Sequence, residues 1–452
     1  MTTIMTETRD IPGPPRTWLF GNQREFSRDQ LNTLDRWAAK YGDFVSARFG
    51  RREIVFVNHP DAIEQVLVEL NRKFIKHYRL RQTRRTLGQG LLTSEGDFWR
   101  EQRKLAQPAF HRERIKAYGQ CMVDFTERMI ADWRDGQIRD IHNDMMHLTL
   151  EIVAKTLFDA ELGGQWAEAS RAMETLMECF VARTGSLITP PDWMPTPVNL
   201  RVLRAIRRLE SILAEIIKTR RTSGEDRGDL LSMLLHAQDE ESGRSMSDQQ
   251  LRDEVMTLFM AGHETTANTL AWAWFLLARN PTAERALHAE LDLVLGDRPP
   301  CPDDLPRLKY AGHVIAETLR LYPPGWMLGR EAIEPVEVGG RPIAKGVTVF
   351  MPQWVVHRDP RWYDDPLTFR PERWGEGLLE RIPRYAYFPF GGGPRICIGN
   401  NFALMETVLV LAAIARKFRP RLVPGAIVRP LASMTLRPAK GVPVVIEARA
   451  AQ

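Results

Sequence analysis

The sequence predicts a mainly α-helical protein that carries a smaller β-rich part. Between residues 98 and 240 the apolar side chains recur at spacings of three and four and β-branched runs are few, as in successive amphipathic helices. Residues 247–280 give the longest helical signal of the chain. Short apolar segments near both ends of the chain predict strands. We therefore expect a large helical part and a small β-rich part.

The other predicted elements lie before and after these helices. Residues 11–15 read IPGPP, a stiff extended segment, because proline fixes its own φ and restricts the residue before it. The remaining predictions, in chain order, are two strands within 42–57 around a turn at 50–52, a short helix over 59–70, a helix over 308–322, short strands near 336–338 and 347–351, a last helix from residue 401, and paired strands over 434–446.

The long helix has recognisable ends and an unusual middle. Ser247 and Gln250 have the spacing of a capping box, and Pro281 ends the pattern. Residues 261–266 read AGHETT, which is poor helix sequence. A helical glycine costs about 1 kcal/mol relative to alanine, and threonine hydroxyls compete for backbone carbonyls. We therefore expect a local distortion of the helix at these residues.

Composition places the chain among ordinary globular proteins. Its 62 Lys and Arg residues against 57 Asp and Glu give a net charge of +5 over 452 residues, too slight to indicate a nucleic-acid partner. The cysteines form no CxxC pair, which excludes a disulfide scaffold or a zinc ribbon and suits a reducing compartment. These cysteines are Cys121, Cys179, Cys301 and Cys397.

The sequence also carries a prediction about location. The first ten residues, MTTIMTETRD, are polar and lack the regions of a signal peptide. No apolar run reaches the ~18–20 residues that a membrane-spanning helix needs. We expect a cytoplasmic protein without a transmembrane anchor, and a monomer.

The most informative segment is 390–399, which reads FGGGPRICIG. Its three glycines allow positive φ angles and let the backbone approach a large flat ligand. Cys397 precedes a predicted helix, whose peptide dipoles stabilise a thiolate. Arg395 can pair with an anionic group of that ligand. A lone cysteine is ordinarily a buried packing residue, but the fixed spacing of phenylalanine, glycine and arginine around this one favours a ligand-binding loop.

This segment resembles the haem-binding loop of the cytochrome P450 family, FxxGxRxCxG. Four further segments resemble motifs of that family in the expected order, and each of them alone is weak. They are WREQR at 99–103 (WxxxR), AGHETT at 261–266 ([AG]Gx[DE]TT), ETLR at 317–320 (ExxR) and FRPERW at 369–374 (PERF), with Trp374 in place of phenylalanine. Because all five occur in order over nearly the whole chain, the sequence is identified as a member of the family.

The resemblance implies a fold and a cofactor. It implies one cytochrome P450 domain over residues 1–452, with a β-rich part at roughly 11–75, 325–355 and 430–450 and a helical remainder. Haem b would lie between the long central helix and the cysteine loop, with Cys397 as its axial thiolate and metal ligand. Such a thiolate pushes electron density onto the iron and favours O–O cleavage.

A second group of residues is expected to support the haem loop. Glu317 and Arg320 lie three residues apart, so they share one face of a helix. On the surface such a pair would stabilise little. The resemblance instead implies that they join Arg373 in a buried network on the cysteine side of the haem, with a structural role.

Several cations are expected around the haem propionates, which carry two negative charges. Trp99 and Arg103 lie four residues apart and share a helix face. The resemblance makes both of them propionate donors, together with Arg395 and, at a position where many members place a third cation, Arg330. Phe390, at the start of the loop, is expected to contact the cofactor.

Glu264 and Thr265 are the expected catalytic residues. Activation of iron-bound O₂ needs two protons, and a hydroxyl in the helix can hold ordered water while a carboxylate connects to bulk solvent. The ordinary alternative is a threonine bonded to its own helix and a solvated glutamate. His263 is expected to be a solvent-facing or core-facing helix residue rather than a ligand.

Substrate-facing residues follow from the resemblance, and core packing is the alternative for each of them. The candidates are Ala261, Gly325, Trp326, Met327 and Met434, with Leu91 and Leu92 in an earlier loop. Small residues beside a large one suggest an apolar pocket for an elongated substrate. The AGHETT segment resembles bacterial fatty-acid hydroxylases, and Arg51 and Arg52 would either hold a carboxylate at the channel mouth or form a solvated turn.

We therefore expect a monooxygenase that inserts one atom of O₂ into a C–H bond of a fatty acid or similar lipid. The alternatives are a hydroxylase of terpenoids or steroids, and a peroxide-driven haem-thiolate enzyme. Electrons from NAD(P)H would arrive through a separate reductase and an acidic ferredoxin or flavodoxin. The partner would dock on a basic face near the cysteine. Its expected residues are Arg100, Lys104, Arg381, Arg384, Arg395 and Lys417.

Overall fold

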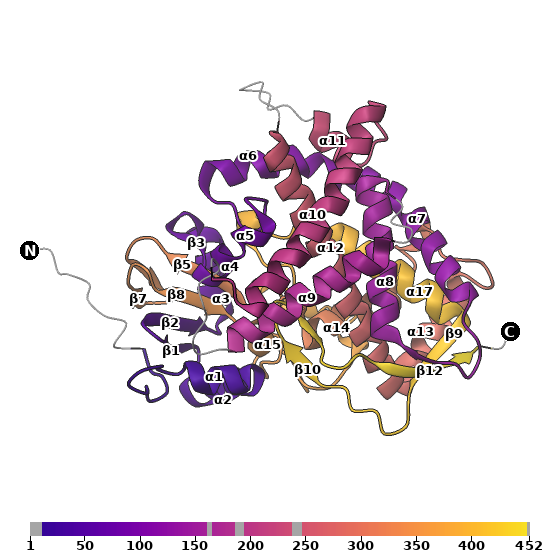
Figure 1. Ribbon diagram of the computed structural model, residues 1–452. Helices are drawn as coiled ribbons and strands as arrows, with labels where there is room; N and C mark the ends of the chain where they lie inside the picture. The colour runs from indigo at the N-terminus through magenta and orange to yellow at the C-terminus, as the bar shows by residue number, and fades with distance from the viewer. Residues whose placement is uncertain (1–10, 161–164, 186–193, 237–245, 450–452) are drawn as a thin grey trace, which may run out of the picture.

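A computed structural model describes residues 11–160, 165–185, 194–236 and 246–449. Its elements form a large helical part and a smaller sheet-containing part (Figure 1). The predicted helical stretch up to residue 240 ends outside the described residues. The α-helices are α1 (Gln23–Arg28), α2 (Gln30–Tyr41), α3 (Pro60–Glu64), α4 (Tyr78–Gln82), α5 (Arg84–Leu87), α6 (Gly96–Ala106), α7 (Arg112–Ala131), α8 (Ile141–Phe158), α9 (Trp166–Gly185), α10 (Pro197–Ser223), α11 (Leu230–His236), α12 (Asp248–Arg279), α13 (Pro281–Val294), α14 (Lys309–Leu321), α15 (Gln353–Val356), α16 (Leu378–Arg381) and α17 (Asn400–Lys417).

The largest sheet of the described residues joins strands from both ends of the chain. Its order is β1-β2-β8-β5-β3, and only β2 and β8 pair in parallel. The sheet confirms the two strands predicted around the turn at 50–52. The strands are β1 (Phe44–Phe49), β2 (Arg52–Val57), β3 (Phe74–Lys76), β4 (Ile138–Asp140), β5 (Leu328–Ala332), β6 (Val336–Val338), β7 (Arg341–Ile343), β8 (Thr348–Met351), β9 (Phe418–Leu422), β10 (Pro430–Ala432), β11 (Leu436–Pro438) and β12 (Pro443–Ala448).

The C-terminal strands β10, β11 and β12 do not join this sheet. β12 pairs with β4 and β9 in a separate three-stranded sheet beside the helices, at the opposite end of the molecule from β1 and β2 (Figure 1). β10 pairs only with β11 in the described chain. Residues 434–446 are therefore not one hairpin: β11 and β12 belong to different sheets because each finds its partner elsewhere in the chain.

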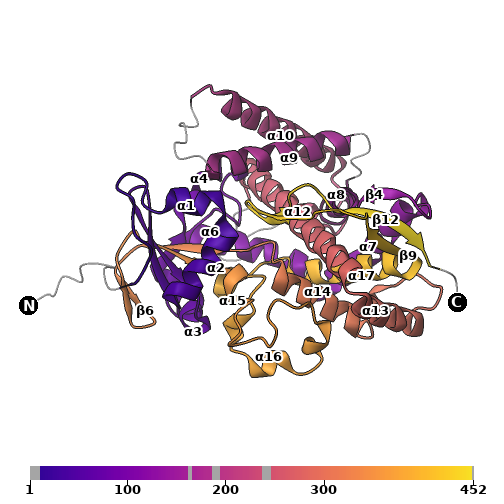
Figure 2. The ribbon, with the colours of Figure 1, turned by 90° about the horizontal axis from the view of Figure 1, so that it is seen from below.

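The long helix α12 crosses the middle of the molecule. Figure 2 shows α9 and α10 on one side of it and α14 and α17 on the other, and α8 also packs against it. Its predicted capping box is present, since the Ser247 hydroxyl accepts from the backbone N–H of Gln250 and the Gln250 side chain accepts from that of Ser247. The predicted distortion is not: residues 248–279 form one uninterrupted helix. The hydroxyls of Thr265 and Thr266 donate to carbonyls one turn earlier without breaking it.

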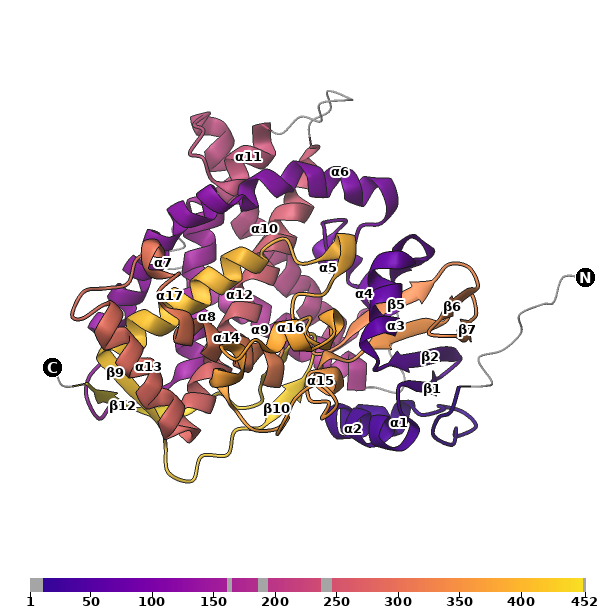
Figure 3. The ribbon, with the colours of Figure 1, turned by 180° about the vertical axis from the view of Figure 1, so that it is seen from behind.

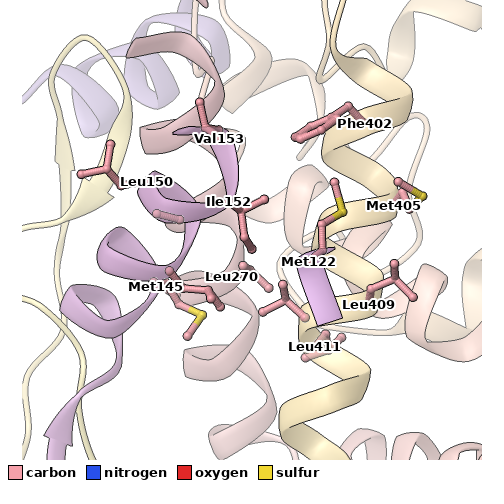
Figure 4. Close-up of a cluster of buried hydrophobic side chains, with 14 of the residues drawn as sticks. Met122, Met145, Leu150, Ile152, Val153, Leu270, Phe402, Met405, Leu409 and Leu411 are labelled. Carbon is pink, nitrogen blue, oxygen red and sulfur yellow. The ribbon is translucent and has the colours of Figure 1, made fainter. Parts of the chain in front are cut away.

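The main core lies where four long helices meet. Figure 4 shows side chains from α7, α8, α12 and α17 packed together, among them Met122, Met145, Leu270 and Leu409. Figure 3 shows α17 beside α7 and α13, which cover its outer sides. No described helix is long and apolar enough to cross a membrane. The cysteine loop leads into α17, and the AGHETT segment lies in α12. The core therefore holds the two helices that carry these segments.

Candidate active site

The cysteine loop is shaped by its glycines. Gly391 and Gly393 adopt φ angles of 74° and 65°, which glycine adopts without strain. A Cβ on Gly393 would overlap the carbonyl oxygen of Leu67, and one on Gly392 would overlap the ring of Tyr385. The loop closes when the Cys397 backbone N–H donates to the Phe390 carbonyl over 3.0 Å. These close approaches explain the FGGG sequence. α17 begins at Asn400, one residue before the predicted start.

Cys397 has the surroundings of a thiolate ligand. Burial by the surrounding protein raises the pKa of its thiol, while a backbone hydrogen bond from Gly399 and the charge of Arg103 lower it. The residue nevertheless keeps accessible surface, and so does Ala261 in the middle of the otherwise buried α12. Both residues therefore keep surface that the atoms of the described residues do not cover. Cys121, in contrast, has a thiol pKa raised to about 11 by burial, as expected of a packing residue.

An excess of positive charge lies close to the loop. Arg395 donates to the Ser94 carbonyl over 2.8 Å, forms an ion pair with Glu95 and lies 4.1 Å from the Trp99 ring centroid. Arg330 is buried beside it, and burial followed by repulsion from Arg395 lowers the pKa of Arg330 to about 10. Buried cations that repel one another lower the stability of the folded protein unless an anion binds between them. The cluster fits an anionic ligand such as the two propionates of haem.

Two further residues of this cluster carry no sequence motif. Lys76 on β3 lies opposite Arg330 on β5, and burial, Arg330 and Arg395 hold the pKa of its ammonium well below the usual value. The next residue, His77, has its pKa lowered to about 3 by burial, with Arg330 the first of the neighbouring cations. Its Nδ1 has no hydrogen-bond partner. Only the antiparallel pairing of β3 and β5 brings these residues to the site, so sequence reasoning missed them.

Trp99, Arg103 and Phe390 lie in different places around the loop. Trp99 is buried under the Arg395 guanidinium, within the cation cluster. Arg103 instead donates to the Ile396 carbonyl over 2.9 Å and to Gln107 over 2.8 Å, so its contacts lie next to the cysteine. Phe390 packs against the main core. The structure thus places Trp99 with Arg395 and Arg330, and Arg103 against the backbone of the cysteine loop.

Glu317 is the centre of a buried ionic network on α14. Its carboxylate accepts two hydrogen bonds from Arg320, at 2.9 and 2.8 Å, and one from Arg373 at 3.0 Å. It also accepts from the backbone N–H of Arg370 and from the indole N–H of Trp374, each at 3.0 Å. The three charged side chains are at most 1% exposed. The structure brings together the three residues predicted for this network, and Trp374 adds a hydrogen bond that a phenylalanine could not make.

Glu264 and Thr265 are neighbours on α12 that face different sides. The Thr265 hydroxyl donates to the Ala261 carbonyl over 2.8 Å, next to the accessible surface of α12. Glu264 is 5% exposed and accepts from the Thr435 hydroxyl over 2.7 Å. Burial raises the pKa of the Glu264 carboxyl. The acid and the alcohol thus make no hydrogen bond to each other, and Glu264 is not a solvated residue. The preceding His263 is buried and bonds to the Met146 carbonyl, as expected of a packing residue.

The predicted pocket residues lie in different environments. Ala261 is exposed, and Gly325, Met327 and Met434 are half-buried. Trp326 is 6% exposed within the core between α1, α2 and the large sheet, where its indole N–H donates to the Ser433 carbonyl. We therefore assign Trp326 to core packing, which corrects its predicted place in the pocket.

Comparisons with known proteins agree with this geometry. The family model described as "Cytochrome P450" matches residues 11–443. "Cyclooctatin synthase" from Streptomyces melanosporofaciens is 40% identical over 424 residues, covering 92% of this chain and 91% of the relative. "Cyclooctat-9-en-7-ol 5-monooxygenase" from the same organism is 37% identical over 432 residues, covering 93% and 94%.

A third relative comes from another species of that genus. "Pentalenene oxygenase" from Streptomyces avermitilis is 34% identical over 420 residues, covering 92% of each chain. The family match covers residues 11–443, a range that contains the cysteine loop, the ETLR helix and the AGHETT segment, and each relative aligns with more than nine tenths of this chain. The chain belongs to the cytochrome P450 family and is a haem-dependent monooxygenase.

Proposed function

We propose that this monooxygenase hydroxylates a cyclic terpenoid. The observation that carries the proposal is the set of relatives named for cyclooctatin, cyclooctat-9-en-7-ol and pentalenene, all of them terpenoid compounds, at 34–40% identity. These relatives favour the terpenoid alternative over the fatty acid that the sequence analysis put first. The half-buried Met327 and Met434 and the accessible Ala261 would give such a substrate an apolar surface.

The contacts of Arg52 also weigh against a fatty-acid carboxylate site at the early strand turn. Its guanidinium carbon lies 4.1 Å from the Tyr78 ring centroid, and a guanidinium nitrogen lies 3.9 Å from Glu331. Arg52 therefore already has an aromatic and an anionic partner. A carboxylate at this turn would have to replace both or rely on the exposed Arg51.

We infer that the Cys397 sulfur would bind the haem iron, and that Arg395, Arg330, Lys76 and His77 would hold the haem propionates. When bound, haem supplies the iron that activates O₂. Thr265, whose hydroxyl lies on the accessible side of α12, would orient ordered water there. Glu264 would supply protons from behind it, since burial keeps its pKa above the usual value.

We expect terpenoids to displace the sixth iron ligand at lower concentration than fatty acids do. A spectral titration of the ferric enzyme with pentalenene, cyclooctat-9-en-7-ol, a steroid and a long-chain fatty acid measures this. Affinity for at least one terpenoid should exceed that for the fatty acid by about tenfold, or 1.4 kcal/mol. If the fatty acid saturates first and neither terpenoid shifts the spectrum, the substrate proposal is wrong.

Thr265→Ala is expected to waste electrons rather than to block binding. Without the hydroxyl, product formation should fall by about 10²-fold, the low end of what a positioned proton-transfer group contributes. NAD(P)H consumption should continue, with the electrons recovered as peroxide. Thr265→Ser keeps the hydroxyl and should restore coupling. Unchanged coupling between NAD(P)H and product in Thr265→Ala would remove this role.

Electrons are proposed to come from an acidic ferredoxin or flavodoxin that docks near α16 and the cysteine loop, on the face shown in Figure 3. Three of the arginine and lysine residues predicted for the basic face are paired with carboxylates. Arg395 is half-buried and paired with Glu95, Arg100 pairs with Asp97, and Lys417 pairs with Glu127. Exposed Arg384 lies 5.7 Å from the ring of Tyr385, whose hydroxyl accepts from Gly393 of the loop.

We expect Arg384→Glu to slow reduction by an acidic ferredoxin without changing substrate affinity. Reduction of the wild type should also slow as ionic strength rises through ~0.1 M, where the Debye length is about 10 Å. Arg341→Glu is the control, because Arg341 is an exposed arginine on β7, in the two-stranded sheet of β6 and β7. Insensitivity to salt and to Arg384→Glu would place the partner elsewhere.

Turnover with peroxide alone tests the peroxide-driven alternative. The monomeric state and the cytoplasmic location stay predictions.

A further inference from the structure

The carboxyl group of Glu264 is held by a residue outside every motif of the sequence analysis. Its partner Thr435 lies in the turn between β10 and β11, 171 residues further along the chain, and its hydroxyl donates to Glu264 Oε1 over 2.7 Å. Glu264 and Thr265 are consecutive on α12 and therefore point about 100° apart around the helix axis. Ala261 lies between them around the axis, about 60° from Glu264 and about 40° from Thr265. Thr435 thus binds the acid on the side of α12 away from Thr265.

The hydrogen bonds continue beyond Thr435 toward the surface. Asn268, one turn after Glu264 and fully buried, donates from Nδ2 to the Thr435 hydroxyl oxygen over 3.3 Å. Its Oδ1 lies 3.0 Å from Nε2 of His142, the second residue of α8. His142 is half-buried. One line of three hydrogen bonds therefore connects a buried carboxyl group with a histidine that retains contact with solvent.

Every donor in this line points toward Glu264. An amide nitrogen can only donate and an amide oxygen can only accept, so Nε2 of His142 carries the hydrogen of its bond to Asn268. Asn268 then donates to Thr435, and Thr435 donates to the carboxyl oxygen. Hydrogen bonds with one direction polarise one another, and their combined effect is largest at the acceptor end. That end is the Glu264 carboxylate.

The groups that face the line act on its two ends, the Glu264 carboxyl group and the His142 ring. Burial raises the pKa of Glu264, and the groups that lower it are, in order, Thr435, the charge of Arg437 on β11, and Asn268. Burial lowers the pKa of His142, while Asp140 and Asn268 raise it and Arg437 lowers it. The buried His263 lies near His142. Thr435 is thus the largest of the influences that offset burial at the acid.

The turn that carries Thr435 is fixed from several directions. The Trp326 indole donates to the Ser433 carbonyl over 3.0 Å, and the Trp272 indole donates to the Leu436 carbonyl over 3.1 Å. The Leu436 backbone N–H donates to the Pro324 carbonyl over 2.9 Å. These bonds leave Thr435 little freedom to move away from α12. A hydroxyl held in this way can determine where the carboxyl group lies.

We propose that Thr435, Asn268 and His142 are positioning residues for Glu264, and that their line of hydrogen bonds holds its carboxyl group in place and links it to the surface at His142. The proposal rests on the proposed role of Glu264 in proton supply. The amide of Asn268 does not relay a proton itself; it orients the Thr435 hydroxyl and the His142 ring. The position and the proton affinity of the Glu264 carboxyl group then depend on this line.

Infrared titration of the carbon monoxide complex of the ferrous enzyme tests the proposal without substrate. The carboxylic acid C=O stretch that disappears in Glu264→Gln reports the protonated acid. In Thr435→Val the ionised form loses a donor, so the band should persist to higher pH, with a proton affinity about tenfold greater than in the wild type. His142→Phe should move the same band in the same direction, by less.

Two variants separate positioning from general damage. Thr435→Ser keeps the hydroxyl and should retain the wild-type titration. Thr126→Val removes a buried hydroxyl that bonds only within α7, to the Met122 carbonyl, and should also leave the band unchanged. The carbon monoxide spectrum checks folding in each variant.

One result would overturn the inference: an unchanged Glu264 band in a folded Thr435→Val enzyme. Failure of the terpenoid proposal would appear in the substrate titration alone and would leave this band as it is. A band that shifts while product formation stays fully coupled would show that Glu264 is held by Thr435 but does not supply protons.

Discussion

Replacing Cys397 with serine is expected to abolish the thiolate-specific shift in the spectrum of the reduced carbon monoxide complex. Burial raises the pKa of the Cys397 thiol, while the Gly399 N–H and the charge of Arg103 lower it, and a metal ion deprotonates a thiol that coordinates it. A serine hydroxyl cannot supply a thiolate. The protein should still fold, because no buried ion pair or core contact depends on the sulfur. Monooxygenase activity should be lost together with the shift, since the thiolate favours O–O cleavage.

Cys301→Ser is the matched control for this experiment. The Cys301 thiol lies 3.3 Å from Asp304, in a short turn between α13 and α14, and a serine hydroxyl can donate to the same carboxylate. Its spectrum should be that of the wild type. If Cys397→Ser kept the shifted spectrum while Cys301→Ser lost it, the ligand assignment would be reversed.

Glu317→Ala should remove a large part of the protein's stability. The substitution deletes the acceptor of five hydrogen bonds and leaves Arg320 and Arg373, at most 1% exposed, without their counter-charge. Breaking one partner of a buried ionic group costs about 3–5 kcal/mol, against a total stability of about 5–15 kcal/mol. Thermal and denaturant unfolding measure the loss, and haem content should fall with it.

Glu376→Ala is the control for the same region. Its carboxylate pairs with Arg370 at 3.3 Å, but 52% of the side chain is exposed, so the pair should contribute about 0–1 kcal/mol. Glu317→Gln should be intermediate, since the amide keeps one acceptor oxygen but loses the charge. A Glu317→Ala protein as stable as the wild type would mean that the network does not hold the fold.

The family and the local geometry of the cysteine loop could be predicted from the sequence alone. The positive φ angles of Gly391 and Gly393 and the bond from the Cys397 N–H to the Phe390 carbonyl lie within one short segment. The residue types and their spacing in that segment therefore predict the turn. The ends of α12 were predictable for the same reason, because capping depends on neighbours such as Ser247 and Gln250. The distortion predicted at AGHETT was wrong: local propensity disfavours a helix there, but α12 is packed on several sides and stays regular.

Only the tertiary structure decided which distant residues meet the site. Lys76 reaches the cation cluster through a strand pairing with Arg330, and Thr435 reaches Glu264 across 171 residues, without a motif at either position. Trp326 shows the reverse case, since the resemblance suggested a pocket residue and packing buried it in a core. Strand pairing and burial depend on contacts between segments far apart in the chain, so spacing in the sequence does not report them. The sequence therefore determined the family, the cofactor and the ligand loop, while the fold decided the charge around the haem and the orientation of the acid.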